Sequence, residues 1–500
     1  MSGSAAIEAN APSKRNSVSL TGDQSAADSS APPDAKAHLD GRARVVIENV
    51  VPIVDAGRFA VKRSVGETVI VEVDAFTDGH DKISVALLHR TVGSEHWIES
   101  DMEPLINDRW SGKFPVHSVG WHEFTVVAWV DHFATWRYDF QKRVTAGQNV
   151  SVDLQIGAAI VEEAADAVDG DVRRSLSELA RLFRSESPAE ATEIALGNSL
   201  QTLMRRYAPR RFSSQWPAPV RMWVDRARAR FSTWYELFPR SASPDPNRHG
   251  TLADVQNRLE SIERMGFDVV YLPPIHPIGR AFRKGKNNSP VAEPGDVGSP
   301  WAIGGPEGGH DAIHPQLGTI DDFDRLIAAA KDRGIEIAMD LAFQCSPDHP
   351  YVKQHPEWFR HRPDGTIQYA ENPPKKYQDI YPFDFECKDY QALWNELLRV
   401  TMHWVSHGIQ IFRVDNPHTK PFPFWEWLIA EAKKRAPEVL FLAEAFTRPK
   451  VMYRLGKLGF TQSYTYFAWR NEPWSIKQYF TELTKPPVVD FYRPNAWPNT

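Results

Sequence analysis

The chain has 500 residues, of which 42% are hydrophobic and 24% are charged, and its formal net charge is −6. This composition is typical of a globular protein with several domains, and the weakly acidic charge without a long basic run argues against nucleic acid as a partner. No apolar run is long enough to span a membrane, so we expect no membrane partner. Two cysteines do not make a disulfide framework, which favours a cytoplasmic location.

The first 42 residues are rich in Ser, Ala, Asp and Pro and contain no apolar core. A segment of this composition buries too little apolar surface to fold on its own. We therefore predict a disordered tail over residues 1–42, and neither a signal peptide nor an anchor.

Residues 43–150 have the pattern of a β-domain. Short β-branched runs at 68–76, 83–88 and 123–130 partly alternate between apolar and polar side chains, and turn residues separate them. This pattern predicts an N-terminal β-sandwich. In residues 151–222 the period becomes helical, with leucines at 176, 179 and 182 and again at 196, 200 and 203, which predicts a small helical module.

From residue 223 to residue 500, predicted strands and helices alternate. The strands are expected at 231–235, 267–272, 335–341, 409–415, 439–444 and 462–467, and the clearest helices at 251–265, 320–333, 390–406 and 422–435. Repeated βα units of this size indicate an α/β fold, a (β/α)8 TIM barrel, as the catalytic domain. A long segment, 342–388, follows the third strand, and loops of that length are usually functional.

The number of predicted strands reaches only about seven at Thr500. A barrel that does not close would expose apolar surface and unpaired backbone groups. We therefore expect the barrel, with its long inserted loops, to be incomplete at the C-terminus of this chain.

The segment Phe412-Arg413-Val-Asp415 ends one predicted strand with a cation and an acid two residues apart. Alternate strand residues share a face, so the guanidinium lies one layer beneath the carboxylate. A neighbouring cation favours the ionised form of a carboxylic acid, which suits a nucleophile. A structural ion pair would give the same pattern.

The next predicted strand ends in a second acid, Glu444, and one helix-sized segment separates it from Asp415. Strands joined in this way are parallel, so both acids lie at the carboxyl edge, where parallel barrels carry their chemistry. Paired carboxylates at one site are the usual means of breaking a glycosidic bond.

Four segments, in this order, resemble the ordered signatures of the α-amylase superfamily of retaining glycosidases and transglycosylases: Phe267-Asp-Val-Val-Tyr-Leu-Pro-Pro-Ile-His276, Met339-Asp340-Leu-Ala-Phe-Gln344, Phe412-Arg413-Val-Asp415 and Ala443-Glu444. The resemblance implies that Asp415 is the nucleophile and Glu444 the general acid/base. It also implies that Arg413 is a supporting cation and Asp340 a structural acid. The superfamily's third carboxylate is expected beyond Thr500.

The sequence departs from ordinary amylases at Gln344-Cys345, where those enzymes carry Asn-His. That histidine normally helps to hold the donor sugar, so the pocket is expected to be remodelled. Further segments resemble the maltose-1-phosphate-dependent α-1,4-glucan maltosyltransferases: Arg283-Lys284-Gly-Lys286-Asn287-Asn288, Asp296-Val-Gly-Ser-Pro-Trp301, Glu307-Gly-Gly-His310 and Glu371-Asn372-Pro-Pro-Lys375-Lys376-Tyr377-Gln-Asp379. This likeness extends from about Trp223 to the last residue, and the two segments before it fit the same architecture.

The resemblance implies retaining transfer of maltosyl from α-maltose 1-phosphate to the non-reducing end of an α-1,4-glucan acceptor, with release of phosphate. It places Lys284, Gln344, Asp379 and Asn416 in the donor pocket and implies a homodimer. A sugar phosphate carries a dianion, which Lys375 can attract and which Asn372 and Tyr377 can hydrogen-bond. Each lysine alone has the alternative of a solvated loop charge.

No cofactor is implied by this reaction, and no metal site is predicted. Histidines at 310, 314, 349 and 418 include no pair with zinc-ligand spacing inside one short element. One alternative within the superfamily is an α-glucan hydrolase or a trehalose-forming mutase, although the lysine-rich loops and Gln344-Cys345 argue against it. The other alternative is a non-catalytic glucan-binding protein, which would not need Arg413, Asp415 and Glu444 together.

Overall fold

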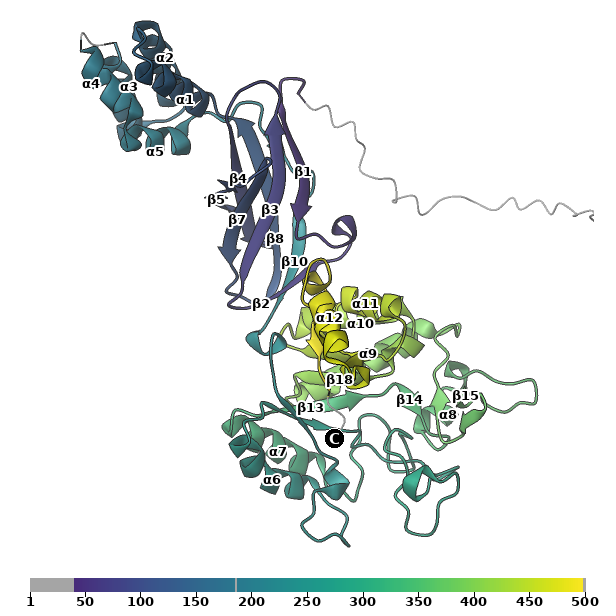
Figure 1. The fold of residues 1–500 in the computed structure, drawn as a ribbon. Helices are drawn as coiled ribbons and strands as arrows, with labels where there is room; N and C mark the ends of the chain where they lie inside the picture. Colours follow the sequence, from purple (N-terminus) through teal and green to yellow (C-terminus); the bar gives the residue numbers. More distant parts are fainter. Residues whose placement is uncertain (1–39, 185–186, 498–500) are drawn as a thin grey trace, which may run out of the picture. The chain divides into compact units, whose positions relative to one another are not determined.

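The structure, a computed structural model, describes residues 40–184 and 187–497. Nearly all of the predicted tail therefore lies outside the described residues. The described residues from 44 onward form one compact unit, which contains an antiparallel sheet, a mixed sheet, a group of helices and a parallel sheet (Figure 1). Of the helices in the described ranges, none combines the length and the hydropathy that crossing a membrane requires.

Two sheets form the N-terminal β-sandwich, of which the first is antiparallel and the second is mixed. The first has the order β1 (Val45–Val51), β3 (Thr68–Thr77), β7 (Arg109–Pro115) and β6 (Glu103–Pro104). The second has the order β2 (Val61–Ser64), β10 (Val220–Asp225), β8 (Gly120–Val130), β4 (Ile83–Thr91) and β5 (Ile98–Asp101), and β9 (Ser214–Gln215) pairs with β8. Alternating valines of β3 are fully buried, as the period-2 pattern predicts.

The helical part lies between two strands of the second sheet. It comprises α1 (His132–Thr145), α2 (Ser151–Asp166), α3 (Gly170–Leu182), α4 (Pro188–Leu196) and α5 (Asn198–Tyr207). Its buried side chains, among them Phe140, Leu176 and Met204, form a hydrophobic cluster of their own. The predicted division at residue 150 therefore falls between α1 and α2, and the division at 222 falls inside β10.

The C-terminal part contains a parallel sheet of seven strands within the described residues. Their order follows the chain: β11 (Trp234–Glu236), β12 (Val269–Leu272), β13 (Glu336–Leu341), β18 (Ile411–Asp415), β19 (Leu440–Glu444), β20 (Gln462–Tyr464) and β21 (Pro494–Asn495). This is the α/β barrel fold that the alternating pattern predicted, with the seventh strand close to the end of the chain.

Helices cover the outer face of this sheet: α6 (Leu252–Arg264), α7 (Ile320–Asp332), α9 (Tyr390–Ser406), α10 (Phe422–Arg435), α11 (Pro449–Lys457) and α12 (Pro473–Leu483). Thr251 and Thr319 begin α6 and α7 with capping boxes, in which an aspartate three residues later completes the exchange of hydrogen bonds. The long segment after β13 contains α8 (Pro350–Gln354), the pair β14 (Gln344–Cys345) and β17 (Tyr381–Pro382), and the hairpin β15 (Ala370–Asn372) and β16 (Lys375–Tyr377).

The two faces of the parallel sheet have different partners. Val270, Met339 and Phe412 belong to the large core formed with the helices. On the other face a smaller cluster, including Val269, Ala338 and Ile411, forms an apolar layer. Because side chains alternate along a strand, the residues two places beyond this layer, such as Asp340 and Arg413, lie on the same inner face nearer the carboxyl ends.

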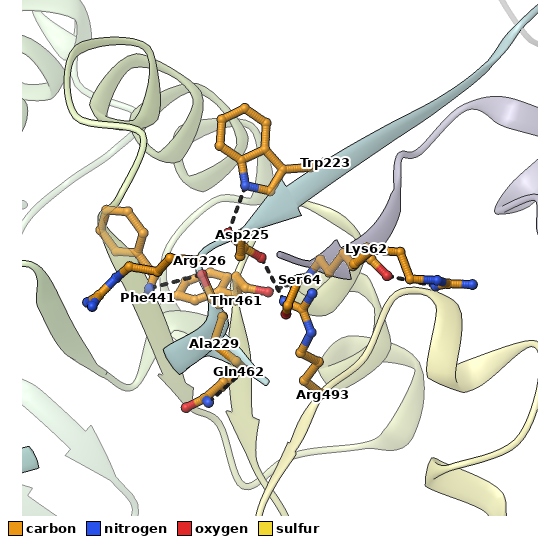
Figure 2. A network of polar contacts seen from close by, with 12 residues as sticks. Lys62, Ser64, Trp223, Asp225, Arg226, Ala229, Phe441, Thr461, Gln462 and Arg493 are labelled. Atoms are coloured by element: carbon orange, nitrogen blue, oxygen red, sulfur yellow. Dashed lines mark hydrogen bonds and ion pairs between the residues drawn. The ribbon is translucent and has the colours of Figure 1, made fainter. Parts of the chain in front are cut away.

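Opposite the carboxyl ends, strand β10 ends in Asp225, which is 1% exposed and lies among cations. Its carboxylate accepts hydrogen bonds from Arg493 Nη1 at 2.6 Å and from the indole nitrogen of Trp223 at 2.7 Å (Figure 2). It also accepts one from Lys433 Nζ at 2.6 Å. The charge of Asp225 also acts on the buried ammonium of Lys62, which donates to the carbonyl oxygens of Gly456 and Phe460. We call Lys62, Asp225, Lys433 and Arg493 the Asp225 network.

Candidate active site

Four charged side chains meet at the carboxyl ends of β13, β18 and β19, and we call Asp340, Arg413, Asp415 and Glu444 the carboxylate cluster. Arg413 Nη1 lies 2.9 Å from Asp340 Oδ2 and 2.9 Å from Asp415 Oδ1. Its Nη2 lies 3.7 Å from Glu444 Oε2. The strand register explains the meeting, because Asp340 is paired with Arg413 and Asp415 with Glu444. The structure thus brings these four predicted site residues together.

Burial shapes the electrostatics of the cluster. Asp340 is 2% exposed, and the Tyr271 hydroxyl donates a hydrogen bond to it over 2.5 Å. Burial raises the pKa of Asp340, and Arg413 opposes this effect. Burial alone would lower the pKa of Arg413, but the surrounding acids hold that pKa well above its usual range. Arg413 therefore stays charged among the carboxyls.

The Glu444 carboxyl is placed to exchange a proton. Burial raises its pKa, and the negative charge of Asp415 adds to the effect, while Arg413 opposes it. A carboxyl of this kind holds its proton to higher pH than an exposed glutamate, as a general acid requires. The backbone N–H of Asn416 donates to Glu444 over 3.1 Å, and the Asn416 amide nitrogen lies 3.4 Å from Asp415. Asn416, which was also predicted, therefore contacts both acids.

Lys284 lines a cavity of about 410 Å³ in the loop after β12, and Gln344 contacts one of the other lining residues. Lys284 lines it together with Arg240 and Trp301, and Gln344 Nε2 donates to the Trp301 carbonyl over 3.3 Å. The indole nitrogen of Trp301 is buried without a hydrogen-bond partner in the described part of the chain. The wall thus combines cations with an unpaired donor, which suits an anionic ligand rich in hydroxyl groups.

Asp379 is buried close to Lys284. Its Oδ1 accepts no hydrogen bond from any residue that the structure describes. Burial raises its pKa, and the charge of Lys284 opposes the shift. A buried carboxyl oxygen without a donor costs free energy, which a ligand hydroxyl can offset.

The residues predicted to bind the phosphate, Asn372, Lys375 and Tyr377, belong to a small hairpin in the long segment after β13. Asn372 pairs with Lys375 in its turn, and Tyr377 pairs with Ala370 at its base. Asn372 and Lys375 are exposed, and Tyr377 is half-buried. Across the described ranges, no hydrogen bond or ion pair joins these three residues to the carboxylate cluster, so their part in the site stays a prediction.

The structure also shows residues that sequence reasoning missed. Lys420, five residues after Asp415, is only 8% exposed and donates to the backbone oxygens of Asp415 and Asn416. Tyr271 lies in an apolar run of β12. Glu236 lies at the end of β11, and the charge of Arg413 acts on the Glu236 carboxyl. A tyrosine in a buried strand resembles core, and the sequence gives no sign that a loop lysine is buried. Glu236, as an acid at a predicted strand end, was detectable.

Three buried residues form a group of possible metal ligands. Ligand atoms of His310, Cys345 and His349 are within 4.8 Å of one another and buried. However, His310 Nε2 bonds the Ala342 carbonyl at 2.9 Å, and His310 Nδ1 and His349 Nε2 are 3.0 Å apart. His349 Nδ1 accepts from the Tyr351 N–H. Burial lowers the pKa of His310 to about 4, so neutral rings with all four nitrogens in hydrogen bonds account for the arrangement without an ion.

Comparison with known proteins identifies the family. A model described as α-1,4-glucan:maltose-1-phosphate maltosyltransferase, domain N/S, matches residues 43–226, and one for the α-amylase catalytic domain matches residues 236–395. The α-1,4-glucan:maltose-1-phosphate maltosyltransferase of Methylacidiphilum infernorum is 50% identical over 92% of this chain and 69% of its own length. This chain belongs to that maltosyltransferase family.

Other members of the maltosyltransferase family are equally similar. The enzyme of Chlorobaculum tepidum is 51% identical over 92% of this chain and 69% of its own length, and that of Mycolicibacterium smegmatis is 48% identical over 91% and 70%. Among solved structures, an α-amylase from Lactobacillus plantarum matches 51% of this chain and 60% of its own with 24% identity and a TM-score of 0.42. The family resemblance stated from the motifs is confirmed, and the chain spans about two thirds of the length of these relatives.

Proposed function

We propose that this chain is a retaining maltosyltransferase, which moves maltosyl from α-maltose 1-phosphate to the non-reducing end of an α-1,4-glucan and releases phosphate. The observation that carries the proposal is the pairing of Asp415 with Glu444 at neighbouring strand ends, beneath which Arg413 contacts both. The backbones of adjacent strands are about 5 Å apart, so register partners can bring their carboxyl groups to the separation of about 5–5.5 Å that retaining enzymes use.

In the first half of the reaction, Asp415 attacks the anomeric carbon of the maltosyl group. The bond from that carbon to the phosphate oxygen breaks, a bond to the Asp415 carboxylate forms, and the proton of Glu444 leaves with the phosphate. The raised pKa of Glu444 supports the role of proton donor. Arg413 holds Asp415 and stabilises the negative charges around it.

In the second half, Glu444 accepts a proton from the acceptor hydroxyl, whose oxygen attacks the same carbon and releases Asp415. Two inversions at that carbon give an α-linkage from an α-donor. Water could attack the same carbon in place of the glucan hydroxyl. The site must therefore favour the glucan over water if transfer is to exceed hydrolysis.

The donor is held, in this proposal, by the residues around the 410 Å³ cavity and by the segment after β13. Lys284 attracts the charged donor, and Gln344 and Asp379 hydrogen-bond its hydroxyl groups. Asn416 orients the two catalytic acids through its contacts with them. Lys375, Asn372 and Tyr377 are proposed to bind the phosphate when the hairpin meets the donor.

Incubation of the purified protein with maltose 1-phosphate and a maltooligosaccharide tests the reaction. We expect phosphate release matched by growth of the acceptor in steps of two glucose units. Phosphate release without growth would make the chain a hydrolase, and no turnover would favour a glucan-binding protein.

The roles of the two acids are tested with Glu444→Ala. Phosphate is an adequate leaving group, so the maltosyl-enzyme can form in this variant and then persist because no base activates the acceptor. Intact-mass and peptide mass spectrometry should find one maltosyl adduct on Asp415. An adduct on another residue would contradict the assignment.

We further propose that the protein works in the cytoplasm as a homodimer. The two cysteines, Cys345 and Cys387, are unpaired and buried, which fits a reducing compartment. The dimer is proposed from the family resemblance, and light scattering of the purified protein tests it.

A further inference from the structure

Lys420 is a buried cation beside the carboxylate cluster. It follows the short helix η6 (Pro417–Thr419) after β18, and only 8% of its surface is exposed. Its Nζ lies 3.2 Å from the carbonyl oxygen of Asp415 and 3.3 Å from that of Asn416. No carboxylate of the described residues lies within ion-pair distance of this ammonium. A cation buried among carbonyls is costly unless nearby negative charge compensates it.

The two carbonyls belong to a turn that positions both catalytic acids. Asn416 has φ 42° and ψ 54°, a left-handed conformation that a residue with a side chain rarely adopts. Its carbonyl accepts hydrogen bonds from the backbone N–H and the hydroxyl of Thr419 as well as from Lys420. Its N–H and side chain in turn contact Glu444 and Asp415. Lys420 therefore holds the residue that touches both acids.

Lys420 also completes the charge balance of the cluster. The charged groups acting on it are Asp415, Glu444, Asp340 and Arg413 on the strand ends and His418 on its own turn, and Glu236 acts in addition on Arg413. Burial lowers the pKa of the Lys420 ammonium, and the charges of Asp415, Glu444 and Asp340 oppose this shift. When Glu444 is protonated and both aspartates are ionised, Arg413 and Lys420 match the two negative charges. When Asp415 becomes a maltosyl ester and Glu444 has given up its proton, Asp340 and Glu444 are matched by the same two cations.

We propose that Lys420 is a positioning residue of the transfer reaction, which fixes the turn after the nucleophile and supplies the second cation that keeps the cluster balanced in both half-reactions. This inference rests on the proposed function. It assigns the lysine an effect through Asp415, Asn416 and Glu444, without contact with the maltosyl group.

The test compares Lys420→Met, Lys420→Gln and Lys420→Arg with the wild type in kcat, KM for maltose 1-phosphate and the pH dependence of kcat. Loss of preorganisation should lower kcat of Lys420→Met about a hundredfold with little change in KM. Without the cation, the nearby carboxyls ionise less readily, so both limbs of the pH profile should move up by about one pH unit in the Met and Gln variants. Lys420→Arg keeps the charge and should keep the wild-type limbs.

Lys433→Met is the matched control, because Lys433 is another buried lysine, 6% exposed, whose partner is Asp225. It should lower the melting temperature and leave the pH limbs in place. The proposal is overturned if folded Lys420→Met keeps its pH limbs and a kcat within roughly threefold of wild type. It is also overturned if neither neutral variant folds, since the lysine would then be structural. A wild type that transfers no maltosyl would defeat the proposed function instead.

Discussion

The carboxylate cluster and the Asp225 network are electrostatic opposites at the two ends of the same parallel sheet. In the first, Arg413 is in contact with three acids, Asp340, Asp415 and Glu444. In the second, one acid, Asp225, accepts from Lys433 and Arg493 and lies near a third cation, Lys62. Most side chains of both groups are buried, and Glu444 and Arg493 are partly exposed, so solvent screens the charges of both groups only weakly.

The difference between them teaches which arrangement suits chemistry and which suits stability. Burial alone would raise the pKa of Asp225, but Lys433 and Arg493 outweigh it and hold that pKa well below its usual range. Its charge is therefore fixed across the physiological range. In the carboxylate cluster acids outnumber the cation that contacts them, and the pKa of Glu444 is raised. Where acids are in excess, one of them can hold and exchange a proton. Where cations are in excess, the single acid stays ionised and exchanges none.

The largest effect is expected when the proposed nucleophile is removed from the carboxylate cluster. Asp415→Ala should lower kcat by about 10⁴- to 10⁶-fold, as in other enzymes that lose a nucleophile. Stability should change little, because Arg413 keeps its contacts with Asp340 and Glu444. Steady-state kinetics measures the loss of kcat, and thermal unfolding measures the stability. Turnover close to wild type would remove Asp415 from the mechanism.

The Asp225 network should respond in the opposite way. Asp225→Ala leaves buried Lys433 and Arg493 without their acid, and breaking a buried pair in this way costs about 3–5 kcal/mol. Urea unfolding measures the loss, while kcat of the folded protein should stay within about twofold of wild type.

Asp55→Ala is the control for this experiment, because the Asp55–Lys457 pair joins the same two parts of the chain at the surface. It should cost at most about 1 kcal/mol. Equal losses in the two variants would mean that burial of the Asp225 network adds nothing to stability.

The charge of the donor tests Lys284, a cation of the 410 Å³ cavity that lies outside the Asp225 network. Lys284→Met should lose a charge-assisted hydrogen bond to phosphate worth about 1.5–3 kcal/mol, a drop of roughly ten- to hundredfold in kcat/KM for maltose 1-phosphate. Maltosyl fluoride has no dianion, so its use should fall little. Equal losses with both donors would assign Lys284 to the sugar or to the shape of the loop.

The smallest effects are pH-dependent changes of stability, and their signs differ between the two regions. Because the pKa of Asp225 is lowered on folding, its contribution is present above the unfolded pKa of about 4 and is lost as pH falls through the folded value. Because the pKa of Glu444 is raised, stability declines as pH rises from its unfolded value through its folded value. The free energy of unfolding is measured against pH for two variants. Asp225→Asn should lose the decline towards low pH, and Glu444→Gln should lose the decline towards high pH. Loss of the same slope in both variants would contradict the comparison.

The sequence predicts the carboxylate cluster well because its signal is local. Arg413 and Asp415 lie two residues apart on one strand, and Glu444 ends the next, so strand alternation alone brings them together. The helices α9 and α10 begin and end at the predicted residues, because their apolar positions recur at helical spacing and turn residues flank them.

The Asp225 network was not predicted, because its members come from positions 62, 225, 433 and 493. Strand β10 pairs with β8 across the whole helical part, and no local pattern reveals such a partner. Lys420 was missed for a related reason, since burial of a loop lysine depends on the strands that surround it. The periodicity of a segment predicts its secondary structure, but it does not predict which distant segment that element contacts.

The pairing of β8 with β9 and β10 has a consequence for engineering. Ala128 is opposite Ser214, so the chain leaves the sandwich sheet and returns to it at neighbouring positions. The five helices between them have their own hydrophobic cluster. This segment is an insertion at a hairpin tip, and such sites tolerate exchange. Residues 132–212 can therefore be treated as a cassette, replaceable by a short turn or by a reporter domain.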